Sequence, residues 1–177
     1  RLGVLATAEL LQDADFSPTV AKAMRDRLER LYRFAIETFK NEQKELREKE
    51  ASLAQIDKWM ISRLQVHIQA ATEAMDKLAV RKAIHSALYG LDQDFQWYLR
   101  RTKHQQKTSS RKAVINRVIR DILEAQVKML APVTPHICEE LWEMMSGKGF
   151  ISLAAWPTPD SAVVDLEAEE NEALIIY

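Results

Sequence analysis

Apolar residues in this chain recur at intervals of three and four positions over long stretches, and only short polar breaks separate these stretches. This spacing places the apolar side chains on one face of an α-helix, which has about 3.6 residues per turn. The chain contains only 4 glycines and 5 prolines, a composition that does not favour a turn-rich β architecture. The sequence therefore predicts an all-α fold, an antiparallel bundle of four to five helices with a short, partly extended C-terminal appendage.

The first half of the chain holds two predicted long helices. A short helix over residues 1–11 precedes a long one that begins at Pro18, because Ser17 is a good cap and proline suits the first helical position. The apolar face of this helix carries Val20, Met24, Leu28, Leu31, Tyr32, Ala35 and Phe39. A second long helix begins near Ser52, with the stripe Ile56, Met60, Leu64, Ala71, Met75 and Leu78.

Two further helices follow. One is predicted from Val80 to Arg101, with the stripe Ile84, Leu88, Leu91, Phe95 and Tyr98. Gly90 lies inside it at a cost of about 1 kcal/mol relative to alanine, which indicates a packing or kinking role. The next helix is predicted from about Arg111 to Leu130, with Ser109 or Ser110 as its cap and the stripe Ile115, Val118, Ile119, Ile122 and Met129.

The stretch LAPVTPHICEELWEMM, residues 130–145, predicts a sharp corner between two packed helices. Pro132 ends the preceding helix, Thr134 can cap the next one, and Pro135 occupies its first position. The new helix has the apolar stripe Ile137, Leu141, Met144 and Met145 and is terminated by Ser146, Gly147 and Gly149. Beyond it, the segment GFISLAAWP is expected to be extended, and the acidic tail to form one more short helix.

Enzymatic and metal sites find little support in the sequence. His136 and Cys138 could supply two ligands, but structural zinc requires four and no second cluster occurs. Cys138 beside His136 could be a nucleophile, although a lone cysteine on a helix face is more often a buried hydrophobe. The sequence KTSSR, residues 107–111, lacks the glycines of a phosphate-binding loop. We therefore predict no catalytic residue, no metal and no cofactor in this chain.

Charge is distributed unevenly along the chain, although its net charge is only −1. The basic block, residues 95–120, contains eight Lys or Arg residues and no acid, whereas residues 159–177 contain six acids and no base. Trp97, Tyr98 and His104 are interleaved with the cations. Basic and aromatic residues together suit nucleic acid, since cations meet phosphates and rings stack on bases. The alternative is a solvated helix hairpin whose cations favour the negative end of a helix.

Three segments, in order, resemble the class Ia aminoacyl-tRNA synthetases. RLGVLATAELLQDADFS (residues 1–17) is similar to the segment that leaves their catalytic domain. IDKWMISRLQ (56–65) resembles their signature D-[KR]-W-[ILM]-[LIM]-S-[RK]-[LIV], and APVTPHICEELWEMM (131–145) with AAWP (154–157) resembles A-P-[FIV]-x-P-[HF]-x-x-E-x-[LI]-W … W-P. The corner and the following segment thus supply a structural motif whose residues are Thr134, Pro135, His136, Glu139, Trp142 and Trp156.

Within this class, YGLDQDFQWYLRR (residues 89–101) resembles the leucyl-tRNA synthetases of the archaeal and eukaryotic-cytosolic type. The isoleucyl and valyl families remain alternatives. The resemblance implies a parent enzyme, a cytoplasmic ligase that uses ATP with Mg²⁺ to attach leucine to tRNA. The family's HIGH and KMSKS motifs are absent, so we expect a non-catalytic fragment that works with the catalytic domain of the same chain.

The resemblance implies an anticodon-binding-type helical bundle over residues 17–150. Residues 1–16 would link it to the catalytic domain, and residues 151–177 would form an extended segment and acidic tail. The expected partner is tRNA and not DNA. No membrane span is expected, because no run of eighteen apolar residues occurs. The candidate tRNA-binding residues are Arg100, Arg101, Lys103, Lys107, Arg111, Lys112 and Trp97, with core packing as the alternative role for Trp97. The alternative function is a helical scaffold that binds protein partners through its acidic tail.

Overall fold

The computed structural model describes residues 1–9, 12–13, 17–42, 52–106 and 108–176. Within these residues every regular element is helical and no strand occurs, which confirms the all-α prediction. The longer elements are α2 (Pro18–Glu42), α3 (Gln55–Asp76), α5 (Leu91–Thr102) and α6 (Ser109–Leu130). The shorter ones are α1 (Leu2–Leu5), α4 (Val80–Ile84), α7 (Pro135–Met144) and α8 (Leu166–Ile176).

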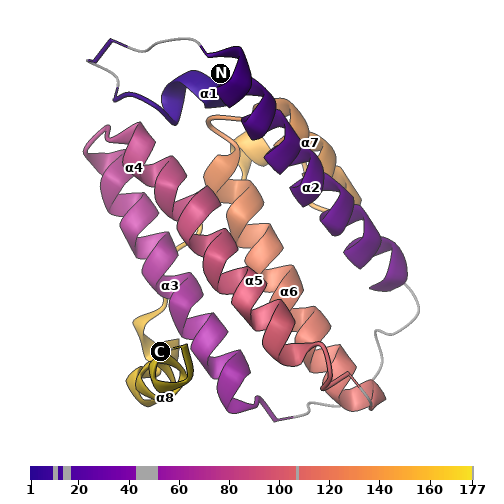
Figure 1. The fold of residues 1–177 in the computed structure, drawn as a ribbon. Helices are drawn as coiled ribbons and strands as arrows, with labels where there is room; N and C mark the ends of the chain where they lie inside the picture. Colours follow the sequence, from indigo (N-terminus) through magenta and orange to yellow (C-terminus); the bar gives the residue numbers. More distant parts are fainter. Residues whose placement is uncertain (10–11, 14–16, 43–51, 107, 177) are drawn as a thin grey trace.

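The long helices lie side by side and alternate in direction, as predicted for an antiparallel bundle (Figure 1). Helices α4 and α5 form one rod beside α3 and α6, while α7 packs against α2 and α6. Helix α8 lies against α3, near the end of the bundle where α5 leads into α6. We call this the α5–α6 end.

The predicted apolar stripes line the core. All five stripe residues of the α4–α5 rod are buried, and so are the five of α6: Ile84, Leu88, Leu91, Phe95, Tyr98, Ile115, Val118, Ile119, Ile122 and Met129. Leu78 is the exception, since it is 70% exposed. Helix α3 ends at Asp76, and Leu78 has a left-handed backbone with φ of 54°, so the helical periodicity no longer applies to it.

The rod formed by α4 and α5 contains a π-helical segment, His85–Gly90, at its centre. A methyl group added at Gly90 would lie 2.7 Å from Cε1 of His67 on α3. Glycine therefore allows the rod to approach α3 closely, which confirms the predicted packing role of Gly90.

The corner between α6 and α7 forms as predicted in outline, with Pro135 as the first residue of α7. The predicted capping bond of Thr134 is wrong, however. Its hydroxyl instead donates to the carbonyl of Leu130 at 3.2 Å, the same carbonyl that accepts from the Thr134 amide at 2.8 Å. The predicted cap of α6 is also wrong by one or two residues. Thr108, rather than Ser109 or Ser110, accepts from the Arg111 amide at 3.3 Å.

The C-terminal appendage is held along α7 and α3. Glu139 accepts from the Ile151 amide at 2.6 Å, and the Trp156 indole donates to the Thr72 hydroxyl at 2.8 Å. The segment predicted to be extended contains a 3₁₀ turn at Ile151–Leu153 and then becomes extended. The predicted last helix is present as α8.

Candidate nucleic-acid interface

The basic block predicted from the sequence occupies the α5–α6 end, but its cations are in different environments. Arg111 and Arg101 are engaged by carboxylates from other elements, whereas the side chains of Arg100 and Lys103 have no carboxylate partner among the described residues. Lys112 is half-buried on the first turn of α6, and Lys107 lies outside the described residues.

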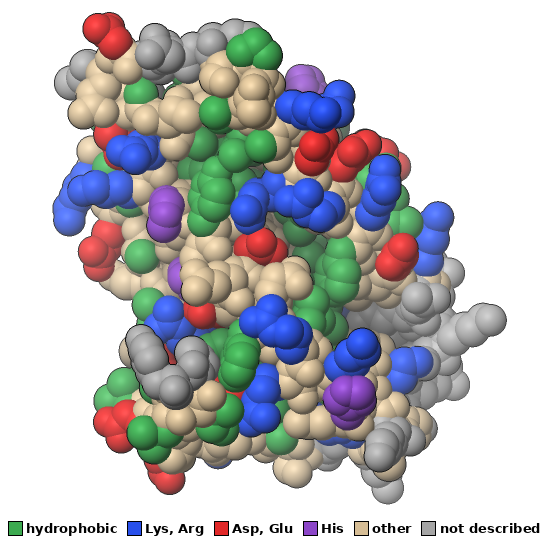
Figure 2. Space-filling model, viewed as in Figure 1, with side chains coloured by type: hydrophobic (Ala, Val, Ile, Leu, Met, Phe, Trp, Pro, Cys, Tyr) green, Lys and Arg blue, Asp and Glu red, His purple; other side chains and the backbone are tan. Residues whose placement is uncertain are grey.

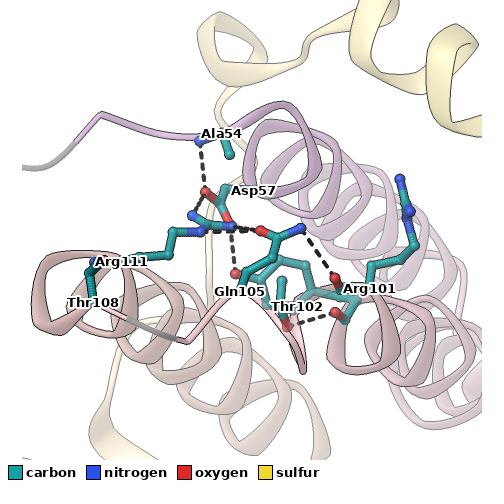
Figure 3. A network of polar contacts seen from close by, with 8 residues as sticks. Ala54, Asp57, Arg101, Thr102, Gln105, Thr108 and Arg111 are labelled. Atoms are coloured by element: carbon teal, nitrogen blue, oxygen red, sulfur yellow. Dashed lines mark hydrogen bonds and ion pairs between the residues drawn. The ribbon is translucent and has the colours of Figure 1, made fainter.

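Arg111 binds Asp57 at the start of α3 (Figure 3). The Asp57 carboxylate is fully buried and also accepts from the Ala54 amide and the Tyr98 hydroxyl, each at 2.8 Å. Burial, reinforced by this carboxylate, raises the pKa of Tyr98 far above its ordinary value. The side-chain amide oxygen of Gln105 also accepts from Arg111 Nη2, at 2.8 Å. Arg111 therefore ties α6 to α3 and to the connecting loop.

Arg101 points away from this network in Figure 3 and engages α8 instead. Its Nε donates to Glu172 at 2.9 Å, and the Trp97 indole donates to the same carboxylate oxygen at 2.7 Å. Trp97 is half-buried and packs against the core, which agrees with the alternative role considered for it. Its ring also lies 5.4 Å from the guanidinium carbon of Arg100.

The cationic surface is our name for Arg100, Lys103 and Arg117, all exposed on the α5–α6 hairpin. None of the three side chains forms a hydrogen bond or ion pair with any residue that the structure describes. Arg100 and Lys103 were among the predicted candidates. Arg117 belongs to the basic block but was not singled out, because nothing in the sequence alone distinguishes a paired cation from an unpaired one.

The profile of a family described as the anticodon-binding domain of tRNA ligase matches residues 57–176. The chain belongs to this family. Over 99% of its length it is 41% identical to the leucine–tRNA ligase of Methanothrix thermoacetophila and 36% identical to that of Pyrococcus abyssi. The chain spans 17% of the length of each of these relatives. These matches confirm the resemblance to archaeal-type leucyl-tRNA synthetases that the sequence motifs indicate.

A solved structure of leucyl-tRNA synthetase (agnB2) from Agrobacterium radiobacter K84, in a ternary complex with tRNA and LeuAMS, has the same fold as this anticodon-binding domain. The TM-score is 0.69 at 19% sequence identity, and the match covers 93% of this chain and 20% of that one. At this level of identity the comparison shows the fold alone, and it confirms the predicted bundle.

The anticodon-binding domain also contains a groove that the sequence did not predict. It has a volume of about 320 Å³, lies between α2, α5 and α6, and is lined by Arg27, Arg30, Leu31, Phe34, Leu88, Asp92, Phe95, Gln96 and Gln126. Figure 2 shows Lys and Arg side chains beside hydrophobic ones on this face of the domain. Arg27 is paired with Asp92 at 2.9 Å. The cations of α2 alternate with acids in the sequence, so charge counting alone does not reveal this face.

A Ser–His–Asp arrangement is the other feature that sequence inspection missed. The His67 ring nitrogens lie 2.9 Å from the Asp94 carboxylate and 3.2 Å from the Ser86 hydroxyl. Burial raises the pKa of Asp94, but hydrogen bonds from His67 and Arg63 outweigh this effect and leave it below its ordinary value. The Ser86 hydroxyl donates to the His67 backbone carbonyl at 3.2 Å, and His67 itself is buried. The arrangement joins α3 to the π-helical segment, and the hydroxyl proton of half-buried Ser86 is directed at a backbone carbonyl.

The residues at the corner between α6 and α7 show no sign of a chemical site. Cys138 is buried, which raises the pKa of its thiol to about 11, and His136 is exposed. Trp142 packs against the core with Lys128 Nζ 5.2 Å from its ring centroid. Among the described residues no group of His, Cys, Asp and Glu could hold a metal ion, and no described helix is long and apolar enough to cross a membrane.

Proposed function

We propose that this chain is the tRNA-docking domain of a leucine–tRNA ligase, and that its cationic surface contacts phosphates of the tRNA. The leucine–tRNA ligases among its relatives support leucine over the isoleucyl and valyl alternatives. The parent ligase would attach leucine to its tRNA with ATP and Mg²⁺ in the cytoplasm. The chemistry would belong to the catalytic domain, and this domain would hold the tRNA.

The observation that carries the proposal is the set of three exposed cations, Arg100, Lys103 and Arg117, on one helix hairpin without acidic partners among the described residues. Leaving three positive charges unpaired on one hairpin gives no folding advantage, because like charges repel each other. Such a surface attracts a polyanion, and its guanidinium and ammonium groups match phosphate oxygens. Phosphate contacts position an RNA without specifying its sequence, so we expect little selectivity among tRNAs.

We do not propose Arg111 as a tRNA contact, because its guanidinium is already bound to the buried carboxylate of Asp57. Lys112 and Lys107 stay candidates from the sequence. Trp97 and Arg101 both donate to Glu172 of α8 in this structure.

Binding of a tRNA transcript at increasing salt tests the proposal. Each phosphate neutralised by Lys or Arg releases counterions, so the logarithm of the binding constant should fall with a slope of about 0.7 to 0.9 per contact. We expect weak, salt-sensitive binding with a dissociation constant of about 10⁻⁴ to 10⁻⁶ M. Undetectable binding at low salt would contradict the proposal and favour a protein scaffold.

A further inference from the structure

Glu172 is an acid buried against a basic surface. Its carboxylate is 4% exposed, and one oxygen accepts both the Trp97 indole N–H and Arg101 Nε. Trp97 and Arg101 are separated by four positions on α5, so they present their donors on the same face. Neither group can accept a hydrogen bond, and together they form an anion-binding pair that α8 fills from the same chain.

Charge also holds the rest of α8 in place. Its inward side includes Asp165, just before the helix, and Glu169, which lie 3.8 Å from Lys58 Nζ and from Arg63 Nη1 respectively. The Ser62 hydroxyl donates to Glu169 and accepts from the Asp165 amide at 3.2 Å. Ala168 is the one buried apolar residue among the α8 side chains that the structure describes.

The apolar side chains of α8 face solvent instead of the bundle. Leu166 is 69% exposed, Leu174 81% and Ile175 52%. A surface helix normally buries its apolar side and exposes its charges, and the hydrophobic effect then holds it in place. In α8 the orientation is reversed, so its attachment rests on ion pairs and hydrogen bonds to α3 and α5. Ion pairs weaken in salt and can be replaced by a competing anion.

The site beneath α8 adjoins the cationic surface, because Arg100 lies over the ring of Trp97 whose indole N–H is bound to Glu172. An RNA strand whose phosphates contact Arg100 and Lys103 would therefore run towards Trp97 and Arg101. An indole N–H and a guanidinium bind a phosphate oxygen as readily as a carboxylate oxygen.

We propose that Trp97 and Arg101 form a second phosphate-binding site for tRNA, which Glu172 occupies in the free protein and vacates when tRNA binds. This inference rests on the function proposed above. Helix α8 then limits the affinity for RNA, since the carboxylate of Glu172 must leave before a phosphate enters.

The experiment compares Glu172→Gln with Glu170→Gln, an exposed acid on the same helix, in binding to a tRNA transcript. Both variants remove one negative charge, but only Glu172→Gln removes the carboxylate from Arg101. We expect Glu172→Gln to bind tRNA about three- to tenfold more tightly, and Glu170→Gln to stay close to wild type. Adding Arg101→Gln to Glu172→Gln should abolish the gain.

Hydrogen exchange on the wild-type chain gives a second measurement that does not depend on any variant folding. We expect the amides of residues 168–172 to exchange faster when tRNA is bound, because α8 leaves its site. If tRNA binds but these amides keep their protection and the two glutamine variants behave alike, α8 is a fixed part of the bundle and this inference is wrong. If tRNA does not bind to any form, the proposed function itself fails.

Discussion

Arg111 on α6 donates both terminal guanidinium nitrogens to the buried carboxylate of Asp57 on α3, 54 positions away in the sequence. The pair shows why charge counting overestimates a binding surface. Arg111 stands in the middle of the basic block, yet its charge is needed inside the fold. Asp57 in turn belongs to the IDKWMISRLQ motif, so one motif residue has a structural role.

Replacing Arg111 by methionine should destabilise the chain by about 3–5 kcal/mol, because it leaves the Asp57 carboxylate buried without a counter-charge. The measurement is the free energy of unfolding from urea denaturation. Lys103→Met on the same hairpin is the control and should change it by less than about 0.5 kcal/mol. Adding Asp57→Asn to Arg111→Met should recover part of the loss. Equal stability of the two single variants would show that the Arg111–Asp57 pair is unimportant to the fold.

Gly90→Ala should destabilise the bundle although alanine is the better helix former. The gain in helix propensity is about 1 kcal/mol, whereas the new methyl group would lie 2.7 Å from the His67 ring. That ring is held on both sides by Ser86 and Asp94 and cannot move away, so we expect overpacking to cost about 1–3 kcal/mol and to exceed the gain.

Gly3→Ala is the matched control for Gly90→Ala, since its added methyl group would lie 3.5 Å from Ala21 Cα, an ordinary contact. Thermal unfolding of both variants gives the comparison. A melting temperature for Gly90→Ala at or above that of Gly3→Ala would rule out the close packing of Gly90 against His67.

Asp94 should make stability depend on acid pH. Its pKa is lower in the folded chain than the ordinary value of 3.8, so its carboxylate stabilises the fold at all pH values above that value. This contribution should disappear as pH falls from about 3.8 through the lower folded pKa. The difference in unfolding free energy between wild type and Asp94→Asn should therefore be constant near neutrality and shrink in that acid range. A difference that grows on acidification would contradict the His67–Asp94–Arg63 network.

Cys138 should be inert towards thiol reagents in the native chain. Burial raises the pKa of its thiol from 9.0 to about 11, and the side chain is 2% exposed. The pKa difference alone lowers the thiolate fraction about a hundredfold relative to the unfolded chain. The measurement is the rate of disulfide exchange with an aromatic disulfide reagent before and after urea unfolding. Rapid reaction of the folded chain would reopen the possibility of a nucleophile at the corner.

Much of the fold could be predicted from the sequence because burial follows helical periodicity. The stripe from Ile84 to Tyr98 identified one continuous rod, and Ser17–Pro18 and Pro132–Pro135 located helix ends within a residue or two. The exact capping residue could not be predicted where several neighbouring polar residues are equally suited to cap a helix. Thr108, Ser109 and Ser110 are all good caps, helical periodicity does not choose among them, and the structure has Thr108 at the capping position.

The candidate site was harder to predict than the fold. The basic block pointed to the α5–α6 hairpin as the candidate surface, but not to which of its cations are paired. The partners of Arg111 and Arg101 lie 54 and 71 positions away, and helical periodicity carries no information about contacts at such separations. The reversed orientation of α8 is visible only when the burial of Glu172 and the exposure of Leu174 are seen together.

The most direct test of tRNA docking is a salt titration of tRNA binding with two charge-matched triple variants. One variant removes the cationic surface, Arg100→Ala, Lys103→Ala and Arg117→Ala. The other removes three exposed cations at the opposite end of the bundle, Lys77→Ala, Arg81→Ala and Lys82→Ala. The first should weaken binding and lower the salt slope by about two to three units, while the second should leave the slope within about half a unit of wild type. Equal slopes for the two variants would contradict docking through the α5–α6 hairpin.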